Sequence, residues 1–222
     1  MPALKTMKGG DQQLRESVLR ELEWEHQITS KEISVAVHNH VVTLSGFAHG
    51  YPEKLAAEKA AKRVYGVKDV LNQLEVKPGL ALADQELARE AIQALQRTIS
   101  VPDTRIEVTV KDGEIGLEGN VDWHFQCEAA EAAVCGLAGV KSVENRIVVS
   151  ATVPGRDVRA KIEEALWRRA GVDPRRITVL SHNGTVELRG TANSWAEKEE
   201  AAAVAWAAPG VTRVDNNILV VS

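Results

Sequence analysis

The stretch HVVTLSGFAH, from His40 to His49, alternates apolar and polar side chains until it reaches a glycine, Gly46. A period of two is typical of a β-strand with one buried face. The same pattern recurs in GEIGLEGNVD at 113–122 and in GTVELRGTAN at 184–193. The corresponding glycines, Gly119 and Gly190, lie 73 and then 71 residues further along (119 − 46 and 190 − 119). Self-similarity at a fixed spacing predicts an internal repeat.

A second set of glycines confirms the period. Each of them follows its anchor glycine by 20 positions: Gly66, Gly139 and Gly210. A valine comes directly after each second glycine, and an asparagine comes six positions after it: Asn72, Asn145 and Asn216. Because the glycine, valine and asparagine keep their offsets in all three places, the chain contains three copies of one unit. We assign these units to residues 11–77, 84–150 and 155–222, and expect residues 1–10 to be disordered.

Each copy has the same order of hydrophobic patterns. A helical stripe comes first, as in Leu14, Val18 and Leu22, and two alternating strands joined by a tight turn follow it. A second helix with a stripe of small residues then leads into a last strand. The fold class is therefore α+β, with three tandem α-β-β-α-β units. In each unit we expect a three-stranded mixed sheet with two helices packed on one face.

The repeated polar and glycine positions suggest local roles. We predict that the aspartates before the first helices are N-caps: Asp11, Asp84 and Asp157. The anchor glycines should end their strands where the chain bends or another backbone comes close. The second glycines should occupy the C′ position of the second helices. The asparagines should point toward the core and bind a backbone segment, and a ligand-binding role for them is the alternative.

The pattern VTLSG, then a helix, then GVKDVLNQL resembles a BON domain (bacterial OsmY and nodulation domain), and all three copies carry its two glycines and its asparagine. The resemblance extends from Asp11 to the end of the chain. It implies the α-β-β-α-β fold and no enzymatic activity or cofactor. It also implies a connection with osmotic stress and the cell envelope, and binding to phospholipid surfaces. A relative in which the domain is joined to a LysM domain binds potassium.

Composition and motifs narrow the functional classes. The net charge of −4 argues against broad, sequence-independent binding to nucleic acid. No P-loop, G-x-S-x-G, CxxC or H-E-x-x-H motif occurs, so we predict that the protein is not an enzyme. Two histidines in the turn HNH at 38–40 could contribute to a metal site, but a metal needs more ligands, and we expect a solvated turn.

Targeting signals and cysteines predict the compartment. The first residues carry lysines without an apolar segment behind them, so we expect no signal peptide. The longest apolar run, AAAVAWAA at 201–208, is too short for a transmembrane segment. Cys127 and Cys135 are eight positions apart on a predicted helix, about 12 Å along its axis, too far for a disulfide. Free thiols and the lack of an export signal predict a cytoplasmic protein.

Charge differs between the copies and suggests one candidate site. Counting Lys and Arg against Asp and Glu gives 9 and 10 in the first copy, 6 and 12 in the second, and 10 and 9 in the third. The basic residues of the third copy gather around a tryptophan: Trp167, Arg168, Arg169, Arg175 and Arg176. Arginine forks bind phosphate, and an indole suits the boundary of a membrane. The alternative is that Trp167 belongs to the core and the arginines are solvated or pair with the acidic second copy.

Two hypotheses follow. In the first, the protein is a non-enzymatic binding or scaffold protein that engages anionic phospholipid or a protein partner, with the third copy providing the basic contact. In the second, it senses potassium or another small ligand. Units of about 70 residues are near the lower limit of independent stability, so we also expect the copies to pack on one another or the protein to form homo-oligomers.

Overall fold

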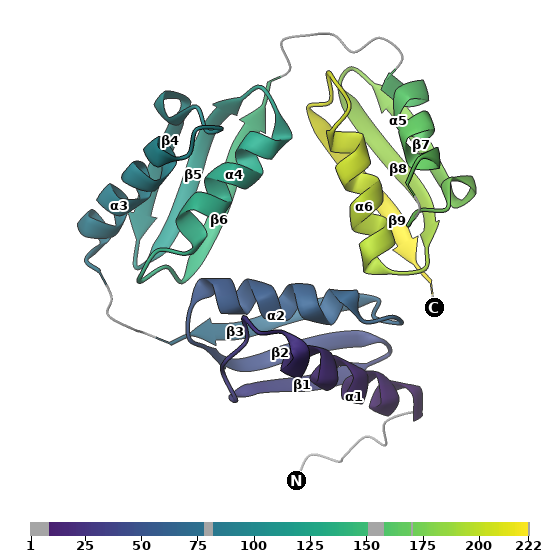
Figure 1. The fold of residues 1–222 in the computed structure, drawn as a ribbon, viewed down its shortest axis with the longest axis horizontal. Helices are drawn as coiled ribbons and strands as arrows, with labels where there is room; N and C mark the ends of the chain where they lie inside the picture. Colours follow the sequence, from purple (N-terminus) through teal and green to yellow (C-terminus); the bar gives the residue numbers. More distant parts are fainter. Residues whose placement is uncertain (1–8, 78–81, 151–157, 170, 222) are drawn as a thin grey trace. The chain divides into compact units, whose positions relative to one another are not determined.

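The computed structural model describes residues 9–77, 82–150, 158–169 and 171–221. Within these ranges the chain forms three sheets of three strands, each accompanied by two α-helices (Figure 1). The predicted α+β class with tandem α-β-β-α-β units is confirmed. The predicted domain boundaries remain predictions. The disorder expected for residues 1–10 lies outside the described residues except at Gly9 and Gly10, where it is wrong because both begin a helix.

The first unit contains α1 (Gly9–Trp24), β1 (Ile33–His38), β2 (Val41–Ala48), α2 (Tyr51–Arg63) and β3 (Asp69–Val76). The strand order is β1-β2-β3, in which β2 is antiparallel to β1 and parallel to β3. The helix α2 is therefore the crossover that joins the two parallel strands. Both helices lie on one face of the sheet (Figure 1).

The second unit repeats this order with α3 (Asp84–Arg97), β4 (Ile106–Lys111), β5 (Glu114–Val121), α4 (His124–Cys135) and β6 (Ser142–Val149). Its strand order is β4-β5-β6, again with an antiparallel pair followed by a parallel pair. A short 3₁₀ turn lies between the first helix and the first strand: Asp103–Arg105.

The third unit contains α5 (Val158–Trp167), β7 (Ile177–His182), β8 (Thr185–Ala192), α6 (Trp195–Trp206) and β9 (Arg213–Val220). Its strand order is β7-β8-β9, and β7 is antiparallel to β8. Another 3₁₀ turn precedes β7: Pro174–Arg176.

The core of each unit lies between the sheet and its helices. In the first unit the inward residues of the central strand, Val42 and Leu44, are fully buried, and so are Val18 of α1 and Ala57 and Ala60 of α2. The alanines have no side chain beyond Cβ, so α2 can lie close to the sheet. The apolar residues of the alternating pattern at 41–44 therefore form the buried face of the central strand.

Asp11 and Asp84, at the start of the first helices of two units, do not act as N-caps. Asp11 lies inside α1, and its two carboxylate oxygens accept from the amides of Asn39 and His40 in the β1–β2 turn at 3.0 and 3.1 Å. In the second unit, Asp84 accepts from the corresponding amides at 2.8 and 3.1 Å. The N-cap there is Ala83, without a side-chain hydrogen bond. The prediction was wrong because the free amides of the hairpin turn compete for the carboxylate; Asp157 lies outside the described residues.

The anchor glycines allow a close approach between backbones, as predicted, but they do not end their strands. Gly119 pairs with Ile106, and β5 continues to Val121. A Cβ at this position would collide with the carbonyl oxygen of Arg105. The same collision would occur at Gly46 and Gly190, and all three glycines have positive φ.

The second glycines adopt the predicted left-handed conformation in a different place. α2 ends at Arg63 with Val64 as its C-cap, so Gly66 lies beyond the C′ position. It is the third residue of a turn closed by the amide of Val67 and the carbonyl of Val64, and its φ is 90°. Gly139 and Gly210 occupy equivalent turns with φ of 88° and 87°.

The recurring asparagines bind backbone segments, as predicted. The Asn72 side chain donates to the carbonyl of Lys54 in α2 at 3.0 Å and accepts from the amide of Leu74 at 3.2 Å. The same two bonds recur in the other units: Asn145 with Cys127 and Ile147, and Asn216 with Lys198 and Ile218. Each asparagine therefore ties the crossover helix to the last strand.

Candidate anionic-ligand surface

The predicted basic cluster lies at the end of α5. Ile162 and Leu166 point into the core and are at most 1% exposed. Trp167 follows Leu166 directly, so the 100° step of the helix turns its indole outward, where it is 62% exposed. The alternative that Trp167 belongs to the core is therefore wrong. An exposed indole of this size suits a contact with a partially apolar surface.

Arg175 lies over the exposed indole. Its guanidinium carbon is 5.8 Å from the centre of the Trp167 ring, within the range of a cation–π interaction. The 3₁₀ turn that carries Arg175 is held by Asp173, whose side chain accepts from the Arg175 amide at 3.1 Å. The loop after α5 thus folds back and places the Arg175 guanidinium beside the end of the helix.

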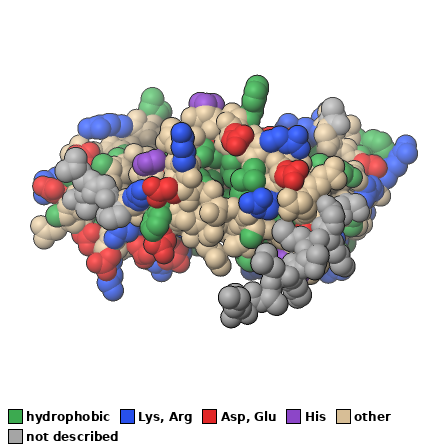
Figure 2. Space-filling view, turned by 90° about the horizontal axis from the view of Figure 1, so that it is seen from below, with side chains coloured by type: hydrophobic (Ala, Val, Ile, Leu, Met, Phe, Trp, Pro, Cys, Tyr) green, Lys and Arg blue, Asp and Glu red, His purple; other side chains and the backbone are tan. Residues whose placement is uncertain are grey.

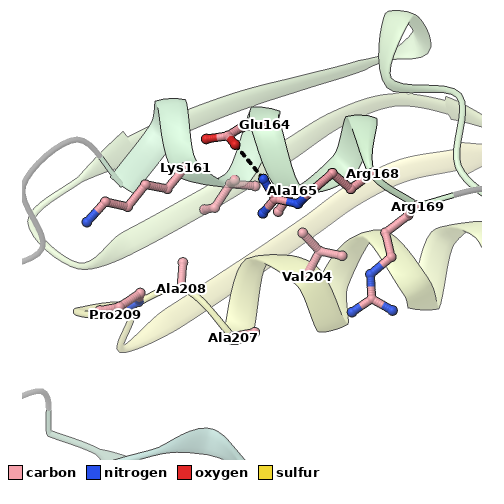
Figure 3. Close-up of a pocket in the computed structure, with 10 residues that line it drawn as sticks. Lys161, Glu164, Ala165, Arg168, Arg169, Val204, Ala207, Ala208 and Pro209 are labelled. Carbon is pink, nitrogen blue, oxygen red and sulfur yellow. Dashed lines mark hydrogen bonds and ion pairs between the residues drawn. The ribbon is translucent and has the colours of Figure 1, made fainter.

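Arg168 and Arg169 lie on the side of α5 that faces α6 (Figure 3). Arg168, the residue just after α5, pairs with Glu164 of α5 at 2.5 Å, and Arg169 pairs with Glu200 of α6 at 2.8 Å. The predicted alternative of pairing with the acidic second copy is wrong for these pairs, because both carboxylates belong to the third unit. All four side chains are at least 38% exposed, so we expect each pair to contribute only about 0–1 kcal/mol and to exchange with external anions.

Arg176 does not join this group. Its Nε and Nη2 atoms both donate to the Thr191 hydroxyl of β8, at 3.0 and 2.9 Å. The structure therefore brings Trp167 and Arg175 together. Arg168 and Arg169 follow Trp167 in the sequence and lie on the side toward α6. Arg176 binds to the sheet instead. On the face shown in Figure 2, acidic and basic side chains are interspersed.

A set of polar side chains that the sequence did not suggest secures the start of the second helix. Glu53 is 6% exposed and accepts from the amides of Thr29, Ser30 and His49. Its counterparts seven positions after the other anchor glycines are Gln126, which accepts from two amides at 3.0 Å, and Glu197, which accepts from the Asp173 amide at 2.9 Å. The constant offset from the glycine is the signal that could have revealed them. They are structural, but Glu197 also fixes the loop that carries Arg175.

Other candidate chemistry is limited in the described part of the chain. Within those ranges, no group of three or more His, Cys, Asp or Glu side chains could hold a metal ion. The HNH turn has left-handed φ at Asn39 and His40, and the His40 Nδ1 atom lies 3.0 Å from the Gly66 carbonyl. Cys127 is buried, and burial raises its pKa to about 11. Cys135 is half-buried, and its thiol donates to the carbonyl of Ala132. Among the described helices, none has the length and apolar character of a membrane span.

Comparison with known proteins finds one domain family three times, once in each copy of the repeat. The family model of the BON domain matches three times, at residues 10–78, 83–151 and 155–222. Osmotically-inducible protein Y of Escherichia coli (strain K12) is 36% identical over 125 residues, which cover 53% of this chain. The match spans 62% of the length of that relative.

Two solved structures of CdsD, a structural protein of the type III secretion system of Chlamydia trachomatis, are also similar. The C-terminal domain of CdsD is 14% identical with a TM-score of 0.25, covering 92% of this chain and 98% of that one. The second CdsD structure is 12% identical with a TM-score of 0.24, covering 94% and 92%.

Proposed function

Since the chain belongs to the BON domain family, we propose that it is a non-enzymatic binding protein that engages anionic phospholipid surfaces through the end of α5. The observation that carries this proposal is the exposed Trp167 with Arg175 over its ring. An indole at the interface and guanidinium groups at the phosphates are a recurrent pairing at membrane surfaces. The similarity to osmotically-inducible protein Y supports a role under osmotic stress.

The energetics favour lipid phosphate over the internal carboxylates when a membrane is near. The pairs formed by Arg168 and Arg169 are exposed and screened by salt, so little is lost when they open. Each basic residue near an anionic membrane contributes about 1 kcal/mol to binding. Glu164 and Glu200 would then face solvent or rotate away from the surface.

The first test reverses two charges at the site. We expect Arg168→Glu/Arg169→Glu to bind phosphatidylglycerol vesicles about 30-fold more weakly, because two contacts of about 1 kcal/mol are lost. Co-sedimentation at low and moderate salt measures this. The control Arg20→Glu/Lys31→Glu makes the same charge change on exposed residues of the first unit and should retain binding. Equal losses in both double variants, or equal binding of neutral and anionic vesicles by the wild type, would contradict the proposal.

The second test removes the indole. We expect Trp167→Ala to weaken vesicle binding several-fold and to leave the melting temperature nearly unchanged, because the side chain is 62% exposed. The weakening should persist at moderate salt, since it comes from apolar contact and not from charge. Unchanged vesicle affinity would mean that the indole plays no part in the contact.

A further inference from the structure

A groove separates α5 from α6 in the third unit, beside the surface described above. Its volume is about 400 Å³, within the range of sites that take small organic molecules. Most of its lining is apolar: Ile162, Ala165, Val204, Ala207, Ala208 and Pro209. Its remaining lining is charged: Lys161, Glu164, Arg168 and Arg169 (Figure 3).

The groove exists because small residues face each other across the two helices. Ala165 of α5 and Ala207 just beyond α6 leave room that larger side chains would fill. Beneath them, Ile162 and Val204 belong to the core and are 0% and 3% exposed. The floor is therefore hydrocarbon supported by packed core, an apolar surface along which an alkyl chain would lie.

The rim of the groove is positively charged and already binds carboxylates. Lys161, Arg168 and Arg169 outnumber the one acidic lining residue, Glu164. Arg168 holds the Glu164 carboxylate at 2.5 Å, and Arg169 holds that of Glu200 at 2.8 Å. Both arginines thus sit in rotamers that present a guanidinium edge to a carboxylate beside an apolar floor.

The other two units provide an internal comparison. In the second unit a groove of about 440 Å³ overlaps this position, since Glu90, Leu137 and Ala138 are the counterparts of Lys161, Ala208 and Pro209. Its charged lining is Glu86, Arg89 and Glu90. In the first unit the groove is about 480 Å³, and its polar lining is Gln13, Ser17 and His40. A groove therefore overlaps this position in each of the three units, whereas a predominantly basic rim occurs only in the third of these three grooves.

We propose that the groove between α5 and α6 binds a single long-chain fatty acid. The alkyl chain would lie on the apolar floor, and the carboxylate would take the place of Glu164 or Glu200 on Arg168 or Arg169. This goes beyond the proposed function, because the ligand is a dissolved molecule that binds in a groove of one unit and not the surface of a bilayer. The two proposals share Arg168 and Arg169 but use different apolar groups, the groove floor here and the exposed Trp167 there.

The experiment is calorimetric titration of the full chain with dodecanoate, kept below its micelle concentration. We expect saturable binding of one molecule that Ala165→Trp weakens by at least about tenfold, because the indole fills the groove. The matched control is Ala94→Trp, which makes the same change at the equivalent position of α3 in the second unit and should bind like the wild type. Absence of binding to the wild type, or equal binding by both variants, would overturn the proposal.

A second variant and a second ligand separate loss of the groove from loss of the fold and from general amphiphile binding. Lys161 is exposed, so Lys161→Glu should keep the wild-type melting temperature and still weaken dodecanoate binding about tenfold. Dodecyltrimethylammonium, which has the same chain and the opposite charge, should not bind, and equal affinity for it would overturn the carboxylate assignment. Phosphatidylglycerol vesicles distinguish the two proposals: Ala165→Trp should still co-sediment, and the wild type should bind dodecanoate whether or not it binds vesicles.

Discussion

We expect Gly119→Ala to destabilise the second unit by about 3 kcal/mol or more, enough to unfold a domain of this size. The φ of Gly119 is 150°, outside the range of L-residues with a side chain. A Cβ there would collide with the carbonyl oxygen of Arg105 and lie 3.1 Å from the Cα of Ile106. Since both contacts are backbone, no side-chain rotation relieves them, and the β4–β5 pair must separate. Urea denaturation and hydrogen exchange of the β5 amides measure the effect.

Gly136 of the same unit is the matched control for this substitution. It is the C-cap of α4, its φ is −87°, and a Cβ there would meet nothing within 4 Å. Gly136→Ala should therefore be neutral or stabilise the unit by up to about 1 kcal/mol. If the two alanine variants unfold at the same urea concentration, the close approach at Gly119 does not constrain the fold.

The sequence was sufficient for the architecture because the repeat supplied three versions of each element. A hydrophobic pattern in a single copy can be ambiguous between helix and strand. It becomes clear here because Val42 and Leu44 have counterparts at the same offsets in the other two copies. The positions of the glycines and asparagines were predicted for the same reason. Which groups the aspartates and the second glycines meet depends on tertiary structure, and there local rules failed.

The aspartates illustrate this limit. A carboxylate before a helix is usually an N-cap, a rule that considers only the nearest amides in the chain. The partners of Asp11 are 28 and 29 positions away, in a hairpin turn whose amides have no strand partner. Backbone hydrogen bonds from His40 and Asn39 hold the pKa of Asp11 below its ordinary value despite the opposing effect of burial. Only the folded unit brings these groups together.

The sequence predicted which residues gather at the candidate site, but not which partners they bind. The cluster of arginines around Trp167 was evident in the sequence, and the helical stripe through Ile162 and Leu166 could have placed the indole outside the core. The partners of the arginines could not be read in the same way. Arg169 reaches Glu200 on another helix, and Arg176 turns to Thr191 in the sheet.

The buried carboxylate of Glu53 should have the second large effect on stability. We expect Glu53→Ala to destabilise the first unit by about 2–4 kcal/mol, because the amides of Thr29, Ser30 and His49 lose their common, charged acceptor in a partly buried site. Hydrogen exchange of these three amides, with thermal denaturation, measures the loss. Glu23→Ala, an exposed change on α1, should have no such effect.

The same carboxylate predicts the direction of the pH dependence. Burial raises the pKa of Glu53, but hydrogen bonds from His49, Ser30 and Thr29 outweigh it and hold the pKa below the ordinary value of 4.5. Because the folded pKa is the lower one, the carboxylate stabilises the unit above pH 4.5, and this contribution disappears as the pH falls through the folded pKa. Glu53→Gln keeps one acceptor oxygen, as Gln126 does in the second unit, but cannot titrate. The difference in melting temperature between wild type and Glu53→Gln should therefore shrink between pH 7 and pH 3, and a constant difference would show that the carboxylate is not responsible.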